Sequence, residues 1–124
     1  MKSKRPPISE QMKGWSAALE GEIGDWPSVQ SRAFFGFTAF YRRNKIFALL
    51  PRTRGMKMAN SLAFKLESAT ARLLEQLQQD PRVGSTQMQK ARWFTFELAA
   101  DADLHDALSW LDRAHEAAGK TSKR

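Results

Sequence analysis

The chain has 124 residues, of which 42% are hydrophobic, and it carries no cysteine and a formal net charge of +7 at pH 7. These values predict one globular domain with a single core, and they exclude disulfides, thiolate metal sites and cysteine nucleophiles. No apolar run approaches the ~20 residues that cross a bilayer, and residues 1–11 lack the apolar stretch of a signal peptide. The sequence therefore predicts a soluble, cytoplasmic protein.

The first predicted element is a helix that follows a loose basic arm, residues 1–7. Ser9 is a typical N-cap residue, because its hydroxyl can accept a hydrogen bond from a free N–H of the first turn. Apolar residues then recur every three or four positions from Met12 to Ile23, which predicts one buried stripe. Pro27 lies shortly after the expected end of this helix.

A strand hairpin is expected next, because the spacing of apolar residues changes to two at Val29. Phe37 and Tyr41 would share one face of the first strand, and a turn at Asn44 would lead into a second strand over residues 45–50. Both faces of this hairpin are apolar. Because a two-layer domain usually leaves one sheet face wet, we expect a helix, a dimer partner or a ligand to cover the second face.

The remaining elements complete a mixed fold. In chain order they are a strand at residues 62–66, a helix capped by Ser68 that carries Leu73, Leu74 and Leu77, a strand at residues 93–98, a helix over residues 104–118 capped by Asp101 or Asp103, and a charged tail, residues 119–124. This order predicts an α+β domain of two layers, an antiparallel β-meander packed with about three helices. All 124 residues belong to this single domain.

Phe35-Gly36-Phe37-Thr38-Ala39-Phe40 comes close to the aromatic half of the octapeptide with which RNA-recognition motifs stack bases. However, Ala33 and Phe34 replace the first two positions of that motif, and at most one short strand precedes them. Aromatic residues in an alternating strand also belong to a core more often than to a binding platform. The sequence therefore does not predict an RNA-recognition motif.

The excess positive charge is concentrated in one segment of the chain. Between Asp25 and Glu67 there are eight basic residues and no acidic residue. Such a segment can bind phosphates, although a basic surface without a specific partner and a surface for another anionic partner remain alternatives. The candidate nucleic-acid-binding residues lie at the predicted hairpin turn and in the following loop: Arg42, Arg43, Lys45, Arg52, Arg54 and Lys57.

The segment from Arg32 to Phe40, followed by Lys45-Ile46-Phe47-Ala48, resembles the TfoX N-terminal domain family, whose members typically read R-x-M-F-G-G-x-x-F, a short turn, then a hydrophobic residue, Phe and Ala. The resemblance extends to the predicted last helix, with Phe34 and Phe37 in place of the family's Met and second Gly. Neighbouring families of the same architecture, such as YjbR-like proteins, are the alternative. The resemblance implies an α+β fold and a link to the regulation of competence genes, and it implies no catalytic residue.

Patterns that accompany catalysis or metal binding are not found in the sequence. The glycines form no phosphate-binding loop. His105 and His115 lie ten residues apart, too far along a helix to share a metal, and each is expected to be solvated. Asp101, Asp103 and Asp106 are expected to interact with the dipole of the last helix rather than with a cation. We therefore predict no enzyme activity, no metal and no cofactor.

The predicted function is that of a non-catalytic binding or regulatory module, linked to transcription or competence. Its expected partners are a second copy, another protein or nucleic acid, and no membrane. The alternative is a small-molecule-binding domain with an aromatic pocket on the sheet. Arg32 is expected to pair with a carboxylate such as Glu97 or Asp112, or to anchor an anion. The candidate ligand or interface residues are Arg32, Phe37, Tyr41, Phe47 and Trp93.

Overall fold

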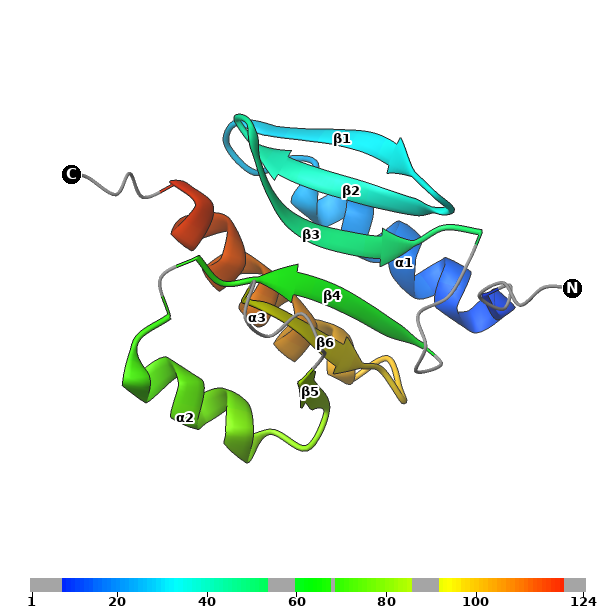
Figure 1. The fold of residues 1–124 in the computed structure, drawn as a ribbon. Coiled ribbons are helices and arrows are strands. Elements are labelled where there is room, and N and C mark those ends of the chain that lie inside the picture. The colour runs from blue at the N-terminus through cyan, green and yellow to red at the C-terminus, as the bar shows by residue number, and fades with distance from the viewer. Residues whose placement is uncertain (1–7, 54–59, 68, 86–91, 120–124) are drawn as a thin grey trace, which may run out of the picture.

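The computed structural model describes residues 8–53, 60–67, 69–85 and 92–119 (Figure 1). These residues form three helices and one six-stranded antiparallel sheet with the strand order β1-β2-β3-β4-β6-β5. The predicted α+β class is therefore confirmed. In chain order the elements are α1 Glu10–Ile23, β1 Val29–Phe34, β2 Phe37–Arg42, β3 Lys45–Pro51, β4 Ser61–Lys65, α2 Ala71–Gln79, β5 Val83–Ser85, β6 Trp93–Glu97 and α3 Asp103–Gly119.

Two of the helices cover one face of the sheet. Figure 1 shows α1 and α3 behind the sheet, with α1 behind β1 to β3 and α3 behind the central strands, whereas α2 lies near β5. We call the face toward α1 and α3 the helix face, and the opposite face the second face. The main core lies between the helix face and the two helices.

Helix α1 begins and packs as its sequence predicts. The Ser9 hydroxyl accepts a hydrogen bond from the backbone N–H of Met12 at 3.0 Å, so the N-cap is confirmed. The predicted stripe from Met12 to Ile23 is buried in the core. Trp15 belongs to this stripe, and its Nε1 donates to Oδ1 of Asp101 at 2.7 Å, which ties α1 to the start of α3.

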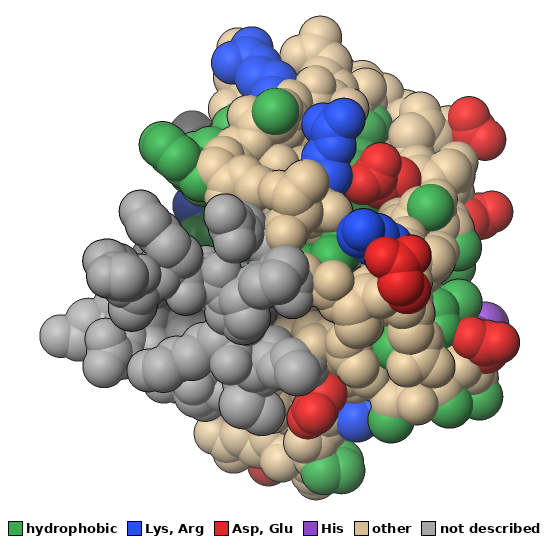
Figure 2. All heavy atoms as spheres, turned by 90° about the vertical axis from the view of Figure 1, so that its right-hand side faces the viewer, with side chains coloured by type: hydrophobic (Ala, Val, Ile, Leu, Met, Phe, Trp, Pro, Cys, Tyr) green, Lys and Arg blue, Asp and Glu red, His purple; other side chains and the backbone are tan. Residues whose placement is uncertain are grey.

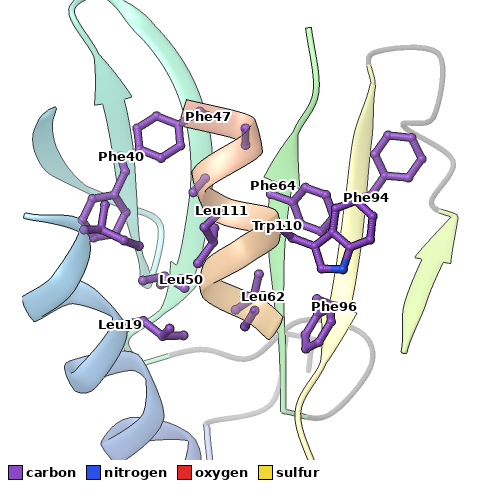
Figure 3. Close-up of a cluster of buried hydrophobic side chains, with 14 of the residues drawn as sticks. Leu19, Phe40, Phe47, Leu50, Leu62, Phe64, Phe94, Phe96, Trp110 and Leu111 are labelled. Carbon is purple, nitrogen blue, oxygen red and sulfur yellow. The ribbon is translucent and has the colours of Figure 1, made fainter. Parts of the chain in front are cut away.

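The core consists of aliphatic and aromatic side chains from the helix face, from α1 and α3, and from Leu77 of α2 (Figure 3). At its centre Phe64 stacks against both Phe94 and Trp110, with ring centroids 6.0 and 5.8 Å from its own. Leu111 of α3 is fully buried beside strand residues such as Leu50. Each fully buried side chain of this size contributes about 1.5–3 kcal/mol to folding.

The alternation of apolar residues predicts that Phe34 to Tyr41 lie on one strand, and this prediction is wrong. The chain turns back at Phe35 and Gly36, and Phe34 of β1 lies opposite Phe37 of β2. Both turn residues have positive φ, 50° for Phe35 and 88° for Gly36, as in a two-residue type I′ turn. Gly36 reaches this conformation at no steric cost, and it makes the turn between two otherwise apolar strands.

The next turn lies where the sequence predicts it, between β2 and β3, but its geometry differs. Arg42 pairs with Lys45, and the positive φ of 59° belongs to Arg43 rather than to Asn44. The backbone N–H of Arg43 donates to the carbonyl of Ser28 at 3.0 Å. This bond extends the β1–β2 pairing by one position and holds Arg43 in its strained conformation.

A bulge in β3 changes which side chains share a face. Phe40 pairs with Ala48, but Tyr41 pairs with Ile46, so Phe47 is an extra residue without an opposite partner on β2. Phe47 and Ala48 consequently both belong to the core under the helices. Simple alternation along residues 45–50 would place Phe47 and Leu49 on one face, but the bulge puts Phe47 on the helix face and Leu49 on the second face.

The second half of the chain differs from expectation at its helix starts and at β5. Thr70 caps α2, because its hydroxyl accepts from the N–H of Leu73 at 3.1 Å, and Ser68 lies outside the described residues. A short strand that the sequence did not predict, β5, lies between α2 and β6. The Asp101 carboxylate accepts a hydrogen bond from Trp15. The Asp103 carboxylate accepts from the backbone N–H groups of Ala99 and Ala100, which precede α3, whereas an N-cap residue accepts from an N–H of the first turn.

Candidate binding surface

The β1–β2 turn exposes two adjacent aromatic rings, which we call the aromatic tip, Phe34 and Phe35. Phe35 is 85% exposed and Phe34 is 41% exposed. Their rings meet edge to face, with centroids 4.9 Å apart and an interplanar angle of 75°. Positive φ in a bulky non-glycine residue costs about 1 kcal/mol or more. The backbone of Phe35 is therefore strained, and its side chain is exposed. The exposed ring at this strained position is a candidate binding element.

Basic side chains lie beside the aromatic tip. The backbone N–H of Arg52, just after β3, donates to the carbonyl of Gly36 at 3.0 Å, which places this exposed residue at the same turn. Exposed Arg32 of β1 lies over the ring of Tyr41, with its Cζ 5.4 Å from the centroid. Figure 2 looks at this end of the molecule and shows hydrophobic and basic side chains next to one another at the top, with most acidic side chains toward the right.

The opposite end of the β2–β3 hairpin carries two exposed bases, Arg43 and Lys45. Arg42 was predicted to act with them, but its side chain is half-buried and engaged within the chain. Its Nη1 donates to the carbonyl of His115 at 3.0 Å, and a Cβ added at Gly119 would clash with its guanidinium. Arg42 therefore holds the end of α3 against the sheet and does not face a ligand.

The remaining predicted phosphate-binding residues do not form one cluster with this turn. Arg52 lies beyond the far end of β3 from Lys45, and a seven-residue strand spans roughly 20 Å. Arg54 and Lys57 lie outside the described residues. The structure thus brings Arg43 and Lys45 together at one end of the sheet, and it brings Arg52 and Arg32 to the side of the aromatic tip.

His115 is buried, with 5% of its surface exposed, so the prediction of a solvated residue is wrong; His105 is exposed as expected. The Nε2 atom of His115 lies 2.9 Å from the carbonyl oxygen of Pro27 and must donate there, so Nδ1 accepts from Arg42 at 3.5 Å. Its ring also contacts Trp26 and Phe47, with centroids 5.4 Å apart in both cases.

The predicted aromatic pocket is divided between the two faces of the sheet. Phe37 and Trp93 form a small buried cluster with Ala63 on the second face, and Tyr41 is half-buried. Phe47 lies on the helix face, so the prediction that it lines one pocket with them is wrong. The cluster around Phe37 is already buried in a single chain and needs no partner to cover it.

The expected pairing of Arg32 with Glu97 or Asp112 is also wrong. Arg32 lies on β1, at one edge of the sheet, whereas Glu97 belongs to β6, four places further across. Asp112 is exposed on α3, which covers the helix face. The Arg32 guanidinium instead stacks on Tyr41.

Sequence reasoning missed an ionic cluster at the other edge of the sheet. Arg82 binds both carboxylate oxygens of Asp80, at 2.9 and 3.0 Å, and also reaches Asp103 at 2.9 Å and Asp106 at 3.0 Å. Hydrogen bonding to Asp80 raises the pKa of Arg82, and the same bond lowers the pKa of Asp80. The pKa of Asp103 is lowered chiefly by the backbone N–H of Ala99 and further by Arg82. This cluster fastens β5 to α3.

An open hollow of about 460 Å³ lies next to this cluster, lined by residues of α2, the α2–β5 turn and α3: Gln76, Gln79, Asp80, Pro81, Arg82 and Trp110. Asp80 and Arg82 already bind each other there. Within the described residues, His, Asp and Glu form no group of three or more that could hold a metal ion. In the same part of the chain no helix is long and apolar enough to cross a membrane.

Comparison with known proteins adds no relative to these observations. The scan against protein-family models found no matching family, and the searches of the curated proteins and of the solved structures found no match.

Proposed function

We propose that this chain is a non-catalytic binding module that engages single-stranded nucleic acid through the aromatic tip and the arginines beside it. The observation that carries the proposal is Phe35, an aromatic ring that is 85% exposed and held on a backbone with positive φ. A fold selected for stability alone would place Asn or Gly there, because these residues suit a type I′ turn. The exposed ring points to a partner that covers it.

The chemistry beside Phe35 suits a nucleic acid. Bases stack on exposed aromatic rings with a contribution of ~1–3 kcal/mol per base, and this stacking tolerates any sequence. Arg52 at the same turn and Arg32 on β1 can meet the phosphates on either side of a stacked base. Between Asp25 and Glu67 the sequence holds no acidic residue, so β1, β2 and β3 themselves add no charge that would repel a polyanion.

A regulatory role forms part of the proposal. It is supported by the resemblance of residues 32–40 and 45–48 to the TfoX N-terminal family, which implies a link to the regulation of competence genes. A module that binds single strands without chemistry of its own would suit that role.

The test of the aromatic tip is fluorescence anisotropy of labelled oligothymidylate titrated with the wild-type protein, with F35A and with L74A. Leu74 is the matched control, because it is an exposed apolar residue on α2, far from the turn. We expect F35A to bind roughly 5- to 150-fold more weakly, as the loss of one stacked base requires. L74A is expected to bind as the wild type does. Equal affinity for F35A and wild type would overturn the proposal.

The charge contribution is measured by repeating the titration at several salt concentrations with R52Q and R72Q. Arg72 is exposed on α2, so R72Q removes the same charge away from the aromatic tip. Each lost phosphate contact lowers the log–log salt slope by about 0.7 on a single strand. We expect this change for R52Q and none for R72Q. Absence of binding by the wild type even at low salt would contradict the proposal outright.

A further inference from the structure

Strand β1 has a free edge. Among the described residues it pairs only with β2, and five of its six residues are exposed. The bond from the N–H of Arg43 to the carbonyl of Ser28 fixes which residues of β1 bond inward, because this pair belongs to the same register as β1 and β2. Inward bonding alternates along an antiparallel strand. Val29, Ser31 and Ala33 therefore direct their N–H and C=O groups outward.

This edge lacks the features that usually prevent pairing with another strand. Natural sheets shorten their edge strands, interrupt them with proline or bulges, or charge them heavily. β1 pairs with β2 over six consecutive positions without a bulge, contains no proline and carries a single charge, Arg32. An edge of this kind is built to receive a strand.

We propose that the strand it receives is β1 of a second copy of this chain, running antiparallel, with Ser31 on the twofold axis. A twofold axis perpendicular to the sheet keeps the side chains of opposed residues on the same face, so the paired positions sum to an even number. With Ser31 opposite the partner's Ser31, Val29 lies opposite the partner's Ala33. All outward-directed groups of both strands are then hydrogen-bonded.

The side chains of β1 agree with this register. Gln30 lies opposite the partner's Arg32, so an amide oxygen faces a guanidinium twice in the dimer. A register centred on Arg32 would instead oppose two like charges, and it would leave the outward groups of Val29 without a partner on the other β1. Registers centred on Val29, Gln30 or Ala33 also leave part of each edge unpaired. Ser31 is thus the one centre that satisfies both backbone and side chains.

The dimer also completes the binding surface, and this part of the inference rests on the proposed function. Phe34 lies opposite the partner's Ser28, whose own neighbour on β2 is the partner's Arg43. Phe34, the partner's Ser28 and the partner's Arg43 then lie side by side on three neighbouring strands. The aromatic tip is therefore about two strand spacings, roughly 10 Å, from the partner's Arg43. Each site then combines the rings of one copy with the exposed turn bases of the other.

The first test is the mass of the protein in solution, measured by sedimentation equilibrium for wild type, S31P and S31A. Proline at position 31 removes an outward N–H while leaving every β1–β2 bond intact, and proline is tolerated on an edge strand. We expect a dimer for wild type and S31A and a folded monomer for S31P. A monomeric wild type, or an S31P variant that remains a dimer, overturns the inference.

A second test does not depend on the folding of the proline variant. The chain has no native cysteine, so S31C introduces a single thiol. Hydrogen-bonded antiparallel pairs have Cα atoms about 5.5 Å apart, within the range that a disulfide spans. Under mild oxidation we expect S31C to form a covalent dimer and A17C, an exposed position on α1, to remain monomeric. No preference of S31C over A17C contradicts the register.

The two proposals fail in different ways. If S31C forms the covalent dimer but the protein binds no oligothymidylate, the strand pairing is supported and the proposed nucleic-acid function is contradicted. If the wild type is a monomer and binds oligothymidylate through Phe35, the proposed function is supported and the dimer, with its shared binding site, is contradicted. If both hold, S31P is expected to bind several-fold more weakly than S31A, because it lacks the partner's Arg43.

Discussion

The two edges of the sheet differ in length and in how they are held. β5 has three residues and is fastened to α3 through Arg82, which binds three carboxylates. β1 has six residues and no such anchor, and it ends in an exposed aromatic pair. Both strands close the same sheet, yet only β5 is shortened and tied down as edge strands usually are.

From this difference we infer different roles for the two edges. At β5 the charged side chains are satisfied within the chain, so that edge contributes to stability. At β1 the strained Phe35, the exposed rings and the outward backbone groups all cost stability or solubility in a lone chain. Features of this kind persist where a partner compensates for them. Stability and binding are therefore expected to respond to opposite edges.

The largest expected effect is on stability at the β5 edge. R82A should lower the free energy of unfolding by about 2 kcal/mol, because Asp80, Asp103 and Asp106 each lose a charged hydrogen-bond donor. The expected loss is no larger because the Arg82 side chain is 31% exposed, and water weakens its ion pairs. Urea denaturation measures this change. The control is R113A, since Arg113 also lies over an aromatic ring but is exposed, and it donates a hydrogen bond to the neutral Gln76. A loss no larger for R82A than for R113A would contradict the anchoring role.

The same cluster predicts acid sensitivity. The pKa values of Asp80 and Asp103 are lowered in the folded protein, so their contribution to stability is present above the unfolded pKa of about 4 and is lost as the pH falls through the folded values. Thermal unfolding should therefore shift to lower temperature below about pH 4. D80N should show a smaller shift over that range than the wild type. An equal shift for both proteins would show that the Asp80 carboxylate does not cause the loss of stability in acid.

The smallest expected effect has the opposite sign and lies at the β1 edge. F35N creates Asn-Gly, the pair that best suits a type I′ turn, and should raise the free energy of unfolding by about 1 kcal/mol. F34N is the control, because Phe34 belongs to the strand and gains nothing from a turn-forming residue. Denaturation curves of the two variants compare them directly. Destabilisation by F35N would show that the exposed ring supports the fold.

Local patterns predicted much of this fold. The spacing from Met12 to Ile23 and the hydroxyl of Ser9 predicted α1 with its cap, because the buried stripe of a helix is visible as a regular spacing in one continuous stretch of sequence. The strands at β3, β4 and β6 were also predicted at their places in the chain, although the faces of β3 were not. His115 could also have been recognised as buried, since it follows the core residue Leu111 by four positions and precedes Ala118 by three.

The parts that sequence reasoning missed depend on geometry that no local pattern carries. The turn at Phe35 was hidden because its first position holds an aromatic residue instead of Asn. The bulge at Phe47 moves a side chain to the other face without any change in composition. The partners of Arg82 on α3 lie 21 and 24 residues away along the chain, and only the packing of β5 against α3 brings them together.

The most direct test of the account is the affinity of F35N for labelled oligothymidylate, measured at low salt beside the wild type and with the stability of both proteins known. The account predicts that F35N is the more stable protein and binds at least fivefold more weakly, about one lost stacking contact. An F35N variant that binds as tightly as the wild type would contradict the claim that the exposed ring at the β1–β2 turn is the binding element.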